Sequence, residues 1–284
     1  MPTVTQPSDD RQTAVDHYEN FPVASWLCPP RLRRPVAAIY WFARTADDIA
    51  DEGSATVEER RHDLLTYRNS LEACLSGNAA SGRWPQVFAN LGVAAREFDL
   101  PRQPLFDLLD AFAQDVEMTA AGAVYADRAE LLDYCRRSAN PVGRLLLHLY
   151  GVDDARSLAQ SDAICSALQL INFWQDVSVD LPRGRYYLPA ADCARDGFTP
   201  QAPSPQALPA LIAQLCGWAR ELMLSGAPLV HGVPGRAGWE LRLVVQGGLR
   251  ILRRIEAIGH RTHERRPTVG ALDVPPMLWA AARM

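Results

Sequence analysis

The chain has 284 residues, of which 48% are apolar, enough to form one large domain or two small ones. Its formal net charge of -4 argues against a nucleic-acid partner. All 29 basic residues are arginines, which excludes a Schiff-base lysine, a pyridoxal phosphate lysine and the lysine of a phosphate-binding P-loop.

Helical periodicity runs along the whole chain, and prolines mark the boundaries. Alternating patterns bounded by hairpin turns, which would predict strands, are absent. The sequence therefore predicts an all-α protein with a single domain over residues 1–284, in which residues 1–9 and 267–284 are less regular. The expected helices cover residues 10–20, 35–52, 56–76, 84–98, 103–120, 127–150, 154–180, 206–225 and 236–262.

The six cysteines are scattered, without a CxxC pair or metal-ligand spacing, so we expect reduced thiols in the core. No stretch reaches about 18 consecutive apolar residues, the length that would span a bilayer, and the N-terminus shows no apolar run typical of a signal peptide. These features favour a cytoplasmic protein. Peripheral contact with the inner face of the cytoplasmic membrane stays open.

An acidic stripe follows the predicted helix over residues 35–52. Tyr40, Arg44, Asp47 and Asp51 fall on one face of this helix, where a soluble helix usually keeps apolar residues. Carboxylates near a helix C-terminus face the negative end of the helix dipole, at a cost of about 0.3–1 kcal/mol each. A bound cation would reverse that penalty. The alternative is a solvated acidic helix end, in which Arg44 pairs with Asp48.

A second stripe lies on the predicted helix over residues 154–180, where Gln169, Asn172, Asp176 and Asp180 share one face. Oxygen ligands of this kind suit Mg²⁺, which binds a few carboxylates together with water and phosphate oxygens. If the two stripes meet across a cavity, they would hold a diphosphate through Mg²⁺, or Mn²⁺ in its place. The metal would promote loss of the diphosphate and leave a carbocation.

The predicted helix over residues 127–150 contains Tyr134 and an internal Asn140-Pro141 step. Proline removes a backbone hydrogen bond and kinks a helix, and the small residues Ala139 and Gly143 would leave room for a ligand. Tyr134 could stabilise a cation through its ring or deliver a water molecule. A simple boundary between two helices is the alternative reading of the Asn-Pro step.

These motifs resemble the squalene and phytoene synthase family. The resemblance rests on residues 40–52, 134–143 and 169–180, and on the sequence Gly-Arg-Tyr-Tyr-Leu-Pro at 184–189, and it covers nearly the whole chain. It implies an isoprenoid synthase fold, a helical bundle around a central hydrophobic cavity. The metal ligands that it implies are Asp47, Asp51, Asn172, Asp176 and Asp180.

The resemblance also implies the roles of further residues. The expected catalytic residues are Tyr134, Asp47, Asp51, Asp176 and Asp180. The expected substrate-binding residues are His17, Asn20, Tyr40, Arg44, Ala139, Gly143, Gln169, Gln175 and Arg185. Gln175 stands where family members often have an arginine, which favours a substrate with a single diphosphate.

Residues 19–25, 42–53, 138–143 and 172–176 are similar to the hydroxysqualene-forming branch of the family, which serves bacterial hopanoid synthesis. This branch converts presqualene diphosphate and water to hydroxysqualene and diphosphate. The resemblance therefore implies an Mg²⁺-dependent lyase that uses no NADPH and could associate with a presqualene diphosphate synthase. Two alternatives remain: a full squalene or phytoene synthase that condenses two prenyl diphosphates, and a non-catalytic assembly factor.

Overall fold

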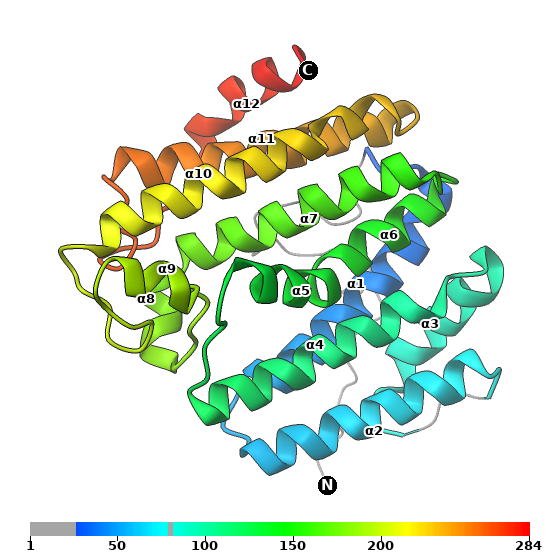
Figure 1. Ribbon diagram of the computed structural model, residues 1–284. Coiled ribbons are helices and arrows are strands. Elements are labelled where there is room, and N and C mark those ends of the chain that lie inside the picture. The colour runs from blue at the N-terminus through cyan, green and yellow to red at the C-terminus, as the bar shows by residue number, and fades with distance from the viewer. Residues whose placement is uncertain (1–26, 79–81) are drawn as a thin grey trace, which may run out of the picture.

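The computed structural model describes residues 27–78 and 82–284, and within these ranges it contains helices and no strand (Figure 1). The all-α prediction is confirmed. The α-helices are α1 (Pro30–Asp51), α2 (Val57–Leu75), α3 (Pro85–Phe98), α4 (Arg102–Ala121), α5 (Arg128–Ser138), α6 (Asn140–Leu149), α7 (Ala155–Gln175), α8 (Val177–Asp180), α9 (Ala190–Arg195), α10 (Leu208–Gly226), α11 (Gly235–Ala257) and α12 (Val274–Ala281). The short 3₁₀ helices are η2 (Leu181–Arg183), η3 (Ala227–His231) and η4 (Ala271–Asp273).

Side-chain caps fix several helix starts close to their expected positions. Thr56 and Glu59 form a capping box at the start of α2, in which the Thr56 backbone N–H donates to the Glu59 carboxylate at 2.7 Å. Asp127 accepts from two backbone N–H groups of α5, and Asp154 accepts from the Ser157 N–H of α7 at 2.9 Å. Each cap satisfies donors that have no partner inside the helix.

Helix α1 begins five residues before its expected start and has Pro35 in its interior. The first turn of a helix tolerates proline because its N–H groups lack helical partners, and Pro30 stands at the first helical position. Pro35 is the sixth residue of α1, so it leaves the Arg31 carbonyl without its helical N–H partner. The earlier start brings Leu32 into the core. The helix start predicted at Pro35 was therefore wrong, because α1 begins at Pro30.

Two expected helices are divided in the structure. The segment 127–150 breaks at Ala139, whose φ of -121° and ψ of -48° separate α5 from α6, so the alternative of a helix boundary is the correct one. The segment 154–180 breaks at Asp176, which separates α7 from α8. Helices α9 and α12 were not expected, and α12 lies in the tail that was expected to be less regular. The expected helix over 10–20 lies outside the described residues.

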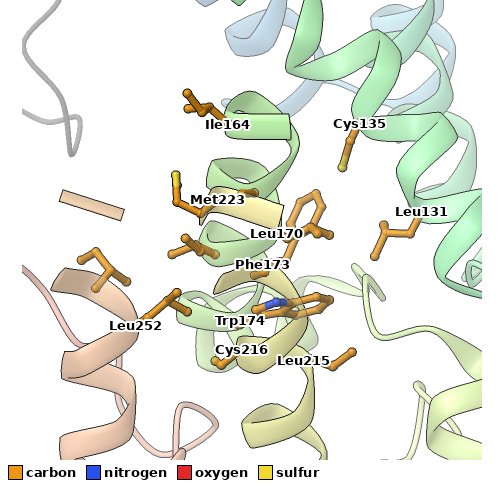
Figure 2. Close-up of a cluster of buried hydrophobic side chains, with 14 of the residues drawn as sticks. Leu131, Cys135, Ile164, Leu170, Phe173, Trp174, Leu215, Cys216, Met223 and Leu252 are labelled. Atoms are coloured by element: carbon orange, nitrogen blue, oxygen red, sulfur yellow. The ribbon is translucent and has the colours of Figure 1, made fainter. Parts of the chain in front are cut away.

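Two hydrophobic clusters flank a central space. One joins α1, α2, α3, α4 and α6, and the other is built mainly from α5, α7, α10 and α11. Figure 2 shows part of the second cluster, with Phe173 and Trp174 of α7 near Leu215 and Met223 of α10. All six cysteines are free, as expected. None of the described helices is both long and apolar enough to cross a membrane.

Candidate active site

A cavity of about 1180 Å³ lies between the two hydrophobic clusters. Its walls come mainly from α1, α4, α5, α6, α7 and α11. Most small-molecule sites enclose about 300–1,000 Å³, so this cavity is large. Helix α1 lines it from Val36 to Asp51, which corresponds to about 22 Å at the helical rise of about 1.5 Å per residue. The cavity therefore suits a long ligand.

The cavity is apolar at one end and charged at the other. On α1 the lining begins with Val36 and Ile39 and finishes with Asp47 and Asp51. Helix α7 shows a similar order, from Ile164 and Leu168 to Gln169, Asn172 and the C-cap residue Asp176. A ligand with a hydrocarbon body and a charged head matches this gradient.

The two acidic stripes meet at the charged end. The lining there includes all five expected metal ligands: Asp47, Asp51, Asn172, Asp176 and Asp180. Arg183 and Arg185, which follow α8, both form ion pairs with Asp51, with Arg183 Nη1 at 3.7 Å from Asp51 Oδ2. These pairs fasten the end of α1 to the segment that follows α7 and α8.

Arginines neutralise the carboxylates of both stripes. Arg44 Nη1 lies 3.1 Å from Asp47 Oδ2, and Arg44 Nη2 lies 2.8 Å from Asp48 Oδ1. Arg266 donates to both oxygens of Asp176, from Nη2 to Oδ2 at 3.3 Å. The pair of Arg44 with Asp48 that the alternative interpretation gave is therefore present. Arg44 also lies on the face that lines the cavity.

The donor chemistry of the charged end fits Mg²⁺ that binds together with a diphosphate. Among the described residues, no group of three or more His, Cys, Asp or Glu side chains is placed to hold a metal ion alone. Mg²⁺ commonly binds through one or two carboxylates, with water and substrate phosphates completing its shell. Each stripe offers one or two carboxylates for this purpose. Burial together with the charge of Asp176 raises the pKa of Asp180 to about 7. A cation would relieve this crowding of negative charge.

Asp115 of α4 is a carboxylate in the cavity wall that the sequence analysis missed. It accepts hydrogen bonds from the hydroxyls of Tyr134 and Tyr187, the latter at 3.4 Å. Burial raises the pKa of Asp115 to about 7, and the nearby charge of Asp47 acts in the same direction. Burial also raises the pKa of Tyr134 well above its usual value, so this hydroxyl stays protonated at neutral pH. The sequence does carry a signal, because Asp115 interrupts the apolar cavity stripe of α4 beside Val116.

Aromatic rings surround Asp115. The rings of Phe173 and Tyr187 stack with centroids 3.8 Å apart and an angle of 9° between their planes. The ring of Tyr134 lies 6.2 Å from each of them. The π faces of such rings attract a cation, and more strongly where water is excluded. This cluster stands between the carboxylates and the apolar part of the cavity.

A sequence profile described as squalene/phytoene synthase matches residues 14–273, which is most of the chain. The chain belongs to this family. The resemblance found from the motifs is thereby confirmed. The helical fold and the cavity with two acidic stripes agree with that membership.

Several relatives within the family are similar to this chain. A hydroxysqualene synthase from Rhodopseudomonas palustris is 34% identical over 273 residues, which are 92% of this chain and 88% of that protein. Another from Sinorhizobium fredii is 38% identical over 187 residues, which are 66% of this chain and 60% of that protein, less than two thirds of its length. The crystal structure of squalene synthase HpnC from Alicyclobacillus acidocaldarius superposes with a TM-score of 0.77 at 34% identity, covering 88% of this chain and 92% of that one.

Most of the residues predicted for this family site line the cavity. Besides the five metal-ligand candidates, the lining includes Tyr40, Arg44, Tyr134, Gly143, Gln169 and Arg185. His17 and Asn20 lie outside the described residues. Arg183 and Arg266 also line the charged end and were not predicted as site residues.

Ala139 and Gln175 do not line the cavity. Ala139 connects α5 to α6, and its small side chain is half-buried at this junction. Gln175 is fully buried, and its Nε2 donates to the Pro267 carbonyl at 2.7 Å. Their placement does not support contact with a substrate. Gln175 instead holds the segment that carries Arg266.

Gly143 lines the cavity and also allows two helices to approach. A Cβ atom at this position would collide with Ser161 Oγ and would lie 2.6 Å from Cys165 Sγ. The absence of a side chain therefore permits the close packing of α6 on α7. Ser161 and Cys165 of α7 fill part of the space beside Gly143, and the rest of that space belongs to the cavity.

Proposed function

We propose that this protein is an Mg²⁺-dependent hydroxysqualene synthase, which converts presqualene diphosphate and water to hydroxysqualene and diphosphate. The observation that carries the proposal is the cavity, in which two acidic stripes meet at one end of a long apolar space. Similarity to hydroxysqualene synthases over most of the chain supports this branch of the family. Such an enzyme would serve hopanoid synthesis, next to a presqualene diphosphate synthase that supplies its substrate.

Side chains at the charged end would bind the diphosphate. Arg44, Arg185 and Arg266 line this end and offer the planar, forked donors that suit phosphate oxygens. Mg²⁺ held by Asp47, Asp51, Asn172, Asp176 and Asp180 would draw negative charge off the leaving diphosphate. The hydrocarbon would extend along α1 and α7 toward Val36 and Ile164.

Loss of diphosphate leaves a carbocation beside the aromatic cluster. The rings of Tyr134, Phe173 and Tyr187 would stabilise the cation through their π faces. The apolar walls exclude bulk water, so the nucleophile that reaches the cation decides the product. The proposed nucleophile is one bound water molecule.

Capture by water requires a proton acceptor. The water oxygen forms a bond to the cationic carbon, and the resulting protonated alcohol must lose one proton. The Tyr134 hydroxyl donates to Asp115, so it can take up this proton as its own passes to the carboxylate. Because burial raises the pKa of Asp115 to about 7, this carboxylate is matched to accept a proton near neutral pH.

The decisive experiment follows the product and its oxygen. Purified protein is incubated with Mg²⁺ in oxygen-18-labelled water, with presqualene diphosphate or farnesyl diphosphate, and with or without NADPH. We expect diphosphate and a labelled thirty-carbon alcohol from presqualene diphosphate, at a rate that NADPH does not change. Farnesyl diphosphate alone should react slowly or not at all.

The alternatives give different products. Efficient conversion of prenyl diphosphates to a condensed hydrocarbon would identify a full squalene or phytoene synthase. Squalene formed only in the presence of NADPH would contradict capture by water. Absence of turnover with every substrate would favour the assembly factor.

A further inference from the structure

Ser138 carries a buried hydroxyl in the wall of the cavity. It is the last residue of α5, and its Oγ atom has no hydrogen-bond partner among the described residues. Buried hydroxyls in folded proteins are nearly always paired with protein or with bound water. The hydroxyl of Ser138 is therefore a binding group of the cavity that the packing of the protein does not use.

Two other helix serines in this chain, Ser70 and Ser225, are satisfied by the backbone of their own helices. Ser70 Oγ donates to the Thr66 carbonyl at 2.9 Å, and Ser225 Oγ donates to the Leu222 carbonyl at 2.7 Å. Such bonds to the preceding turn are the usual solution for serine within a helix. Ser138 makes none, although its helix provides the same carbonyls. The Ser138 hydroxyl is thus available to form a hydrogen bond with a ligand in the cavity.

The position of Ser138 suits a water molecule that meets a cation. Tyr134 precedes it by one helical turn on the same face, with about 6 Å between their Cβ atoms, and both line the cavity. Beyond Ser138 the wall becomes apolar with Val142 and Leu146 of α6. Ser138 therefore stands at the border between the aromatic cluster and the hydrocarbon part of the cavity.

We infer that Ser138 Oγ binds the water molecule that captures the carbocation, with the Tyr134 hydroxyl as its second anchor. This inference rests on the proposed function. The water oxygen forms the carbon–oxygen bond, and the proton that it loses passes through Tyr134 to the carboxylate of Asp115. Without this water the cation loses a proton from the neighbouring carbon and gives a hydrocarbon with one further carbon–carbon double bond, so Ser138 decides between alcohol and hydrocarbon.

The variants Ser138→Thr and Ser138→Val test this role, because threonine and valine have nearly the same shape and differ by the hydroxyl. Both are incubated with presqualene diphosphate and Mg²⁺, and diphosphate release and product composition are measured. We expect Ser138→Thr to retain alcohol as the main product. Ser138→Val should lower the ratio of alcohol to hydrocarbon by about tenfold or more, with diphosphate release within about twofold of that of Ser138→Thr.

Ser161→Ala is the matched control. Ser161 also lines the cavity, but its hydroxyl hydrogen-bonds Cys165, so its removal should leave the product ratio unchanged. Equal product ratios for the threonine and valine variants would overturn the role of Ser138. Absence of alcohol from the unmodified protein would instead contradict the proposed function.

A different observation concerns the outer surface of α12. Leu272, Val274, Leu278 and Trp279 are 88%, 47%, 51% and 61% exposed, and of the eight residues of α12 only Ala281 is buried. Figure 1 shows α12 on the outside of α11, at the opposite side of the molecule from α2. Contiguous exposed apolar side chains commonly mark an interaction site.

Arginine side chains lie against this apolar surface. Residues 235–284 contain nine arginines and four acidic residues, a formal charge of +5, but Arg266 pairs with Asp176 in the cavity and Arg250 and Arg254 pair with Asp273, so the charge beside this face comes from arginines such as Arg242 and Arg283. The Arg283 guanidinium lies 3.9 Å from the centroid of the Trp279 ring, and Arg242 lies 4.9 Å from that of Trp239. Tryptophan and arginine side by side are typical of protein surfaces at the boundary between water and lipid.

The geometry points to an anionic bilayer surface as the partner of this face, which consists of Leu272, Val274, Leu278 and Trp279 with their flanking arginines. Apolar side chains would enter the lipid boundary, and arginines would bind lipid phosphates. Helix α11 lines the cavity with Leu241 and Val244 and also carries α12, since Arg242 Nη1 donates to the Ala281 carbonyl at 3.5 Å. Docking would therefore bring the cavity close to the bilayer.

Sedimentation with lipid vesicles tests this surface independently of catalysis. We expect binding to vesicles of phosphatidylcholine with phosphatidylglycerol, weaker binding at high salt, and little binding to phosphatidylcholine alone. The double variant Leu278→Ser, Trp279→Ser should lower the bound fraction by about tenfold. Leu65→Ser, at an exposed leucine of α2, is the control and should bind like the unmodified protein.

Equal binding of the double variant and the unmodified protein would overturn the proposal. So would a lack of binding to anionic vesicles. Sedimentation velocity adds a further check, since self-association that the double variant abolishes would show that the face meets a second copy of the chain.

Discussion

The side-chain amide of Gln175 donates a hydrogen bond to the backbone carbonyl of Pro267, with Nε2 and O 2.7 Å apart. The residues next to this pair are also bonded, because Arg266 donates to the carboxylate of Asp176. Two adjacent residues at the end of α7 thus hold two adjacent residues of the C-terminal segment. The buried glutamine fixes the backbone from which Arg266 reaches the charged end of the cavity.

Replacing Gln175 should lower stability and loosen Arg266. Gln175→Leu leaves the Pro267 carbonyl without its donor, at a cost of about 1–3 kcal/mol. We expect a fall of several degrees in the thermal midpoint, together with a higher KM and a smaller change in kcat. Gln201→Leu is the control, because Gln201 is exposed and donates to the Gly122 carbonyl at 3.2 Å. An unchanged melting temperature for Gln175→Leu would contradict the structural role.

Two glycines of α10 should respond in opposite ways to alanine. A Cβ atom at Gly226 would collide with the Gln160 carbonyl and lie 2.7 Å from Ile164 Cγ1, so Gly226→Ala should destabilise by about 1–3 kcal/mol. A Cβ atom at Gly217 would meet no other atom within 4 Å, and Gly217→Ala should be neutral or stabilise by up to about 1 kcal/mol. Denaturant unfolding of both variants measures the difference. Similar values for the two would mean that α10 does not approach α7 as closely as described.

The sequence predicted the features that are local. The helices expected from residues 56, 127 and 154 begin within one residue of those positions, because Thr56, Asp127 and Asp154 cap them from neighbouring positions in the sequence. The spacing of the acidic stripes follows from helical periodicity alone. The break at Ala139 was foreseen only as an alternative, because a proline can either kink a helix or begin a new one.

The features that the sequence missed depend on contacts between distant segments. Asp115 becomes a site residue only because α5 and the segment after α8 bring Tyr134 and Tyr187 to it. Gln175 points away from the cavity because the C-terminal segment offers it the Pro267 carbonyl. Neither contact has a signature in the spacing of nearby residues. The motif predicted that Gln175 binds substrate because it is next to Asp176 in the sequence. In the helix, however, its side chain points into the core.

Metal binding should depend on diphosphate. Because no three carboxylates among the described residues are placed to hold an ion alone, Mg²⁺ by itself should change the thermal midpoint little. Mg²⁺ together with inorganic diphosphate should raise it by several degrees, since a ligand at about 100 times its Kd adds about 2.7 kcal/mol. EDTA should abolish both this shift and turnover.

Asp47→Ala should lose the shift caused by Mg²⁺ with diphosphate and should remain folded, because it removes one of several crowded carboxylates. Asp110→Ala is the control on the outer side of α4, where Asp110 pairs with Arg68. A full shift or normal turnover in Asp47→Ala would remove this residue from the metal site.

The pH dependence of stability should report the protonation of Asp115. Burial raises the pKa of Asp115 to about 7 in the folded protein, against about 3.9 in an unfolded chain. Between these values the native state holds a proton that the unfolded chain has released, so the free energy of unfolding falls as the pH rises. The stability that Asp115 contributes through this proton is fully present below about pH 4 and is lost as the pH rises through about 7.

Asp115→Asn keeps the shape of the side chain and an oxygen that accepts a hydrogen bond, and it removes this titration. Relative to the unmodified protein, the variant should gain about 2–3 kcal/mol in free energy of unfolding between pH 5 and pH 8, because each pKa unit corresponds to about 1.4 kcal/mol. Asp180, whose pKa is also raised to about 7, still titrates in the variant, so some pH dependence persists. Urea unfolding at several pH values measures the difference. Parallel stability curves for the two proteins would show that Asp115 is ionised in the folded state at pH 5, and the carboxylate would then be too weak a base to take the proton released on capture of water.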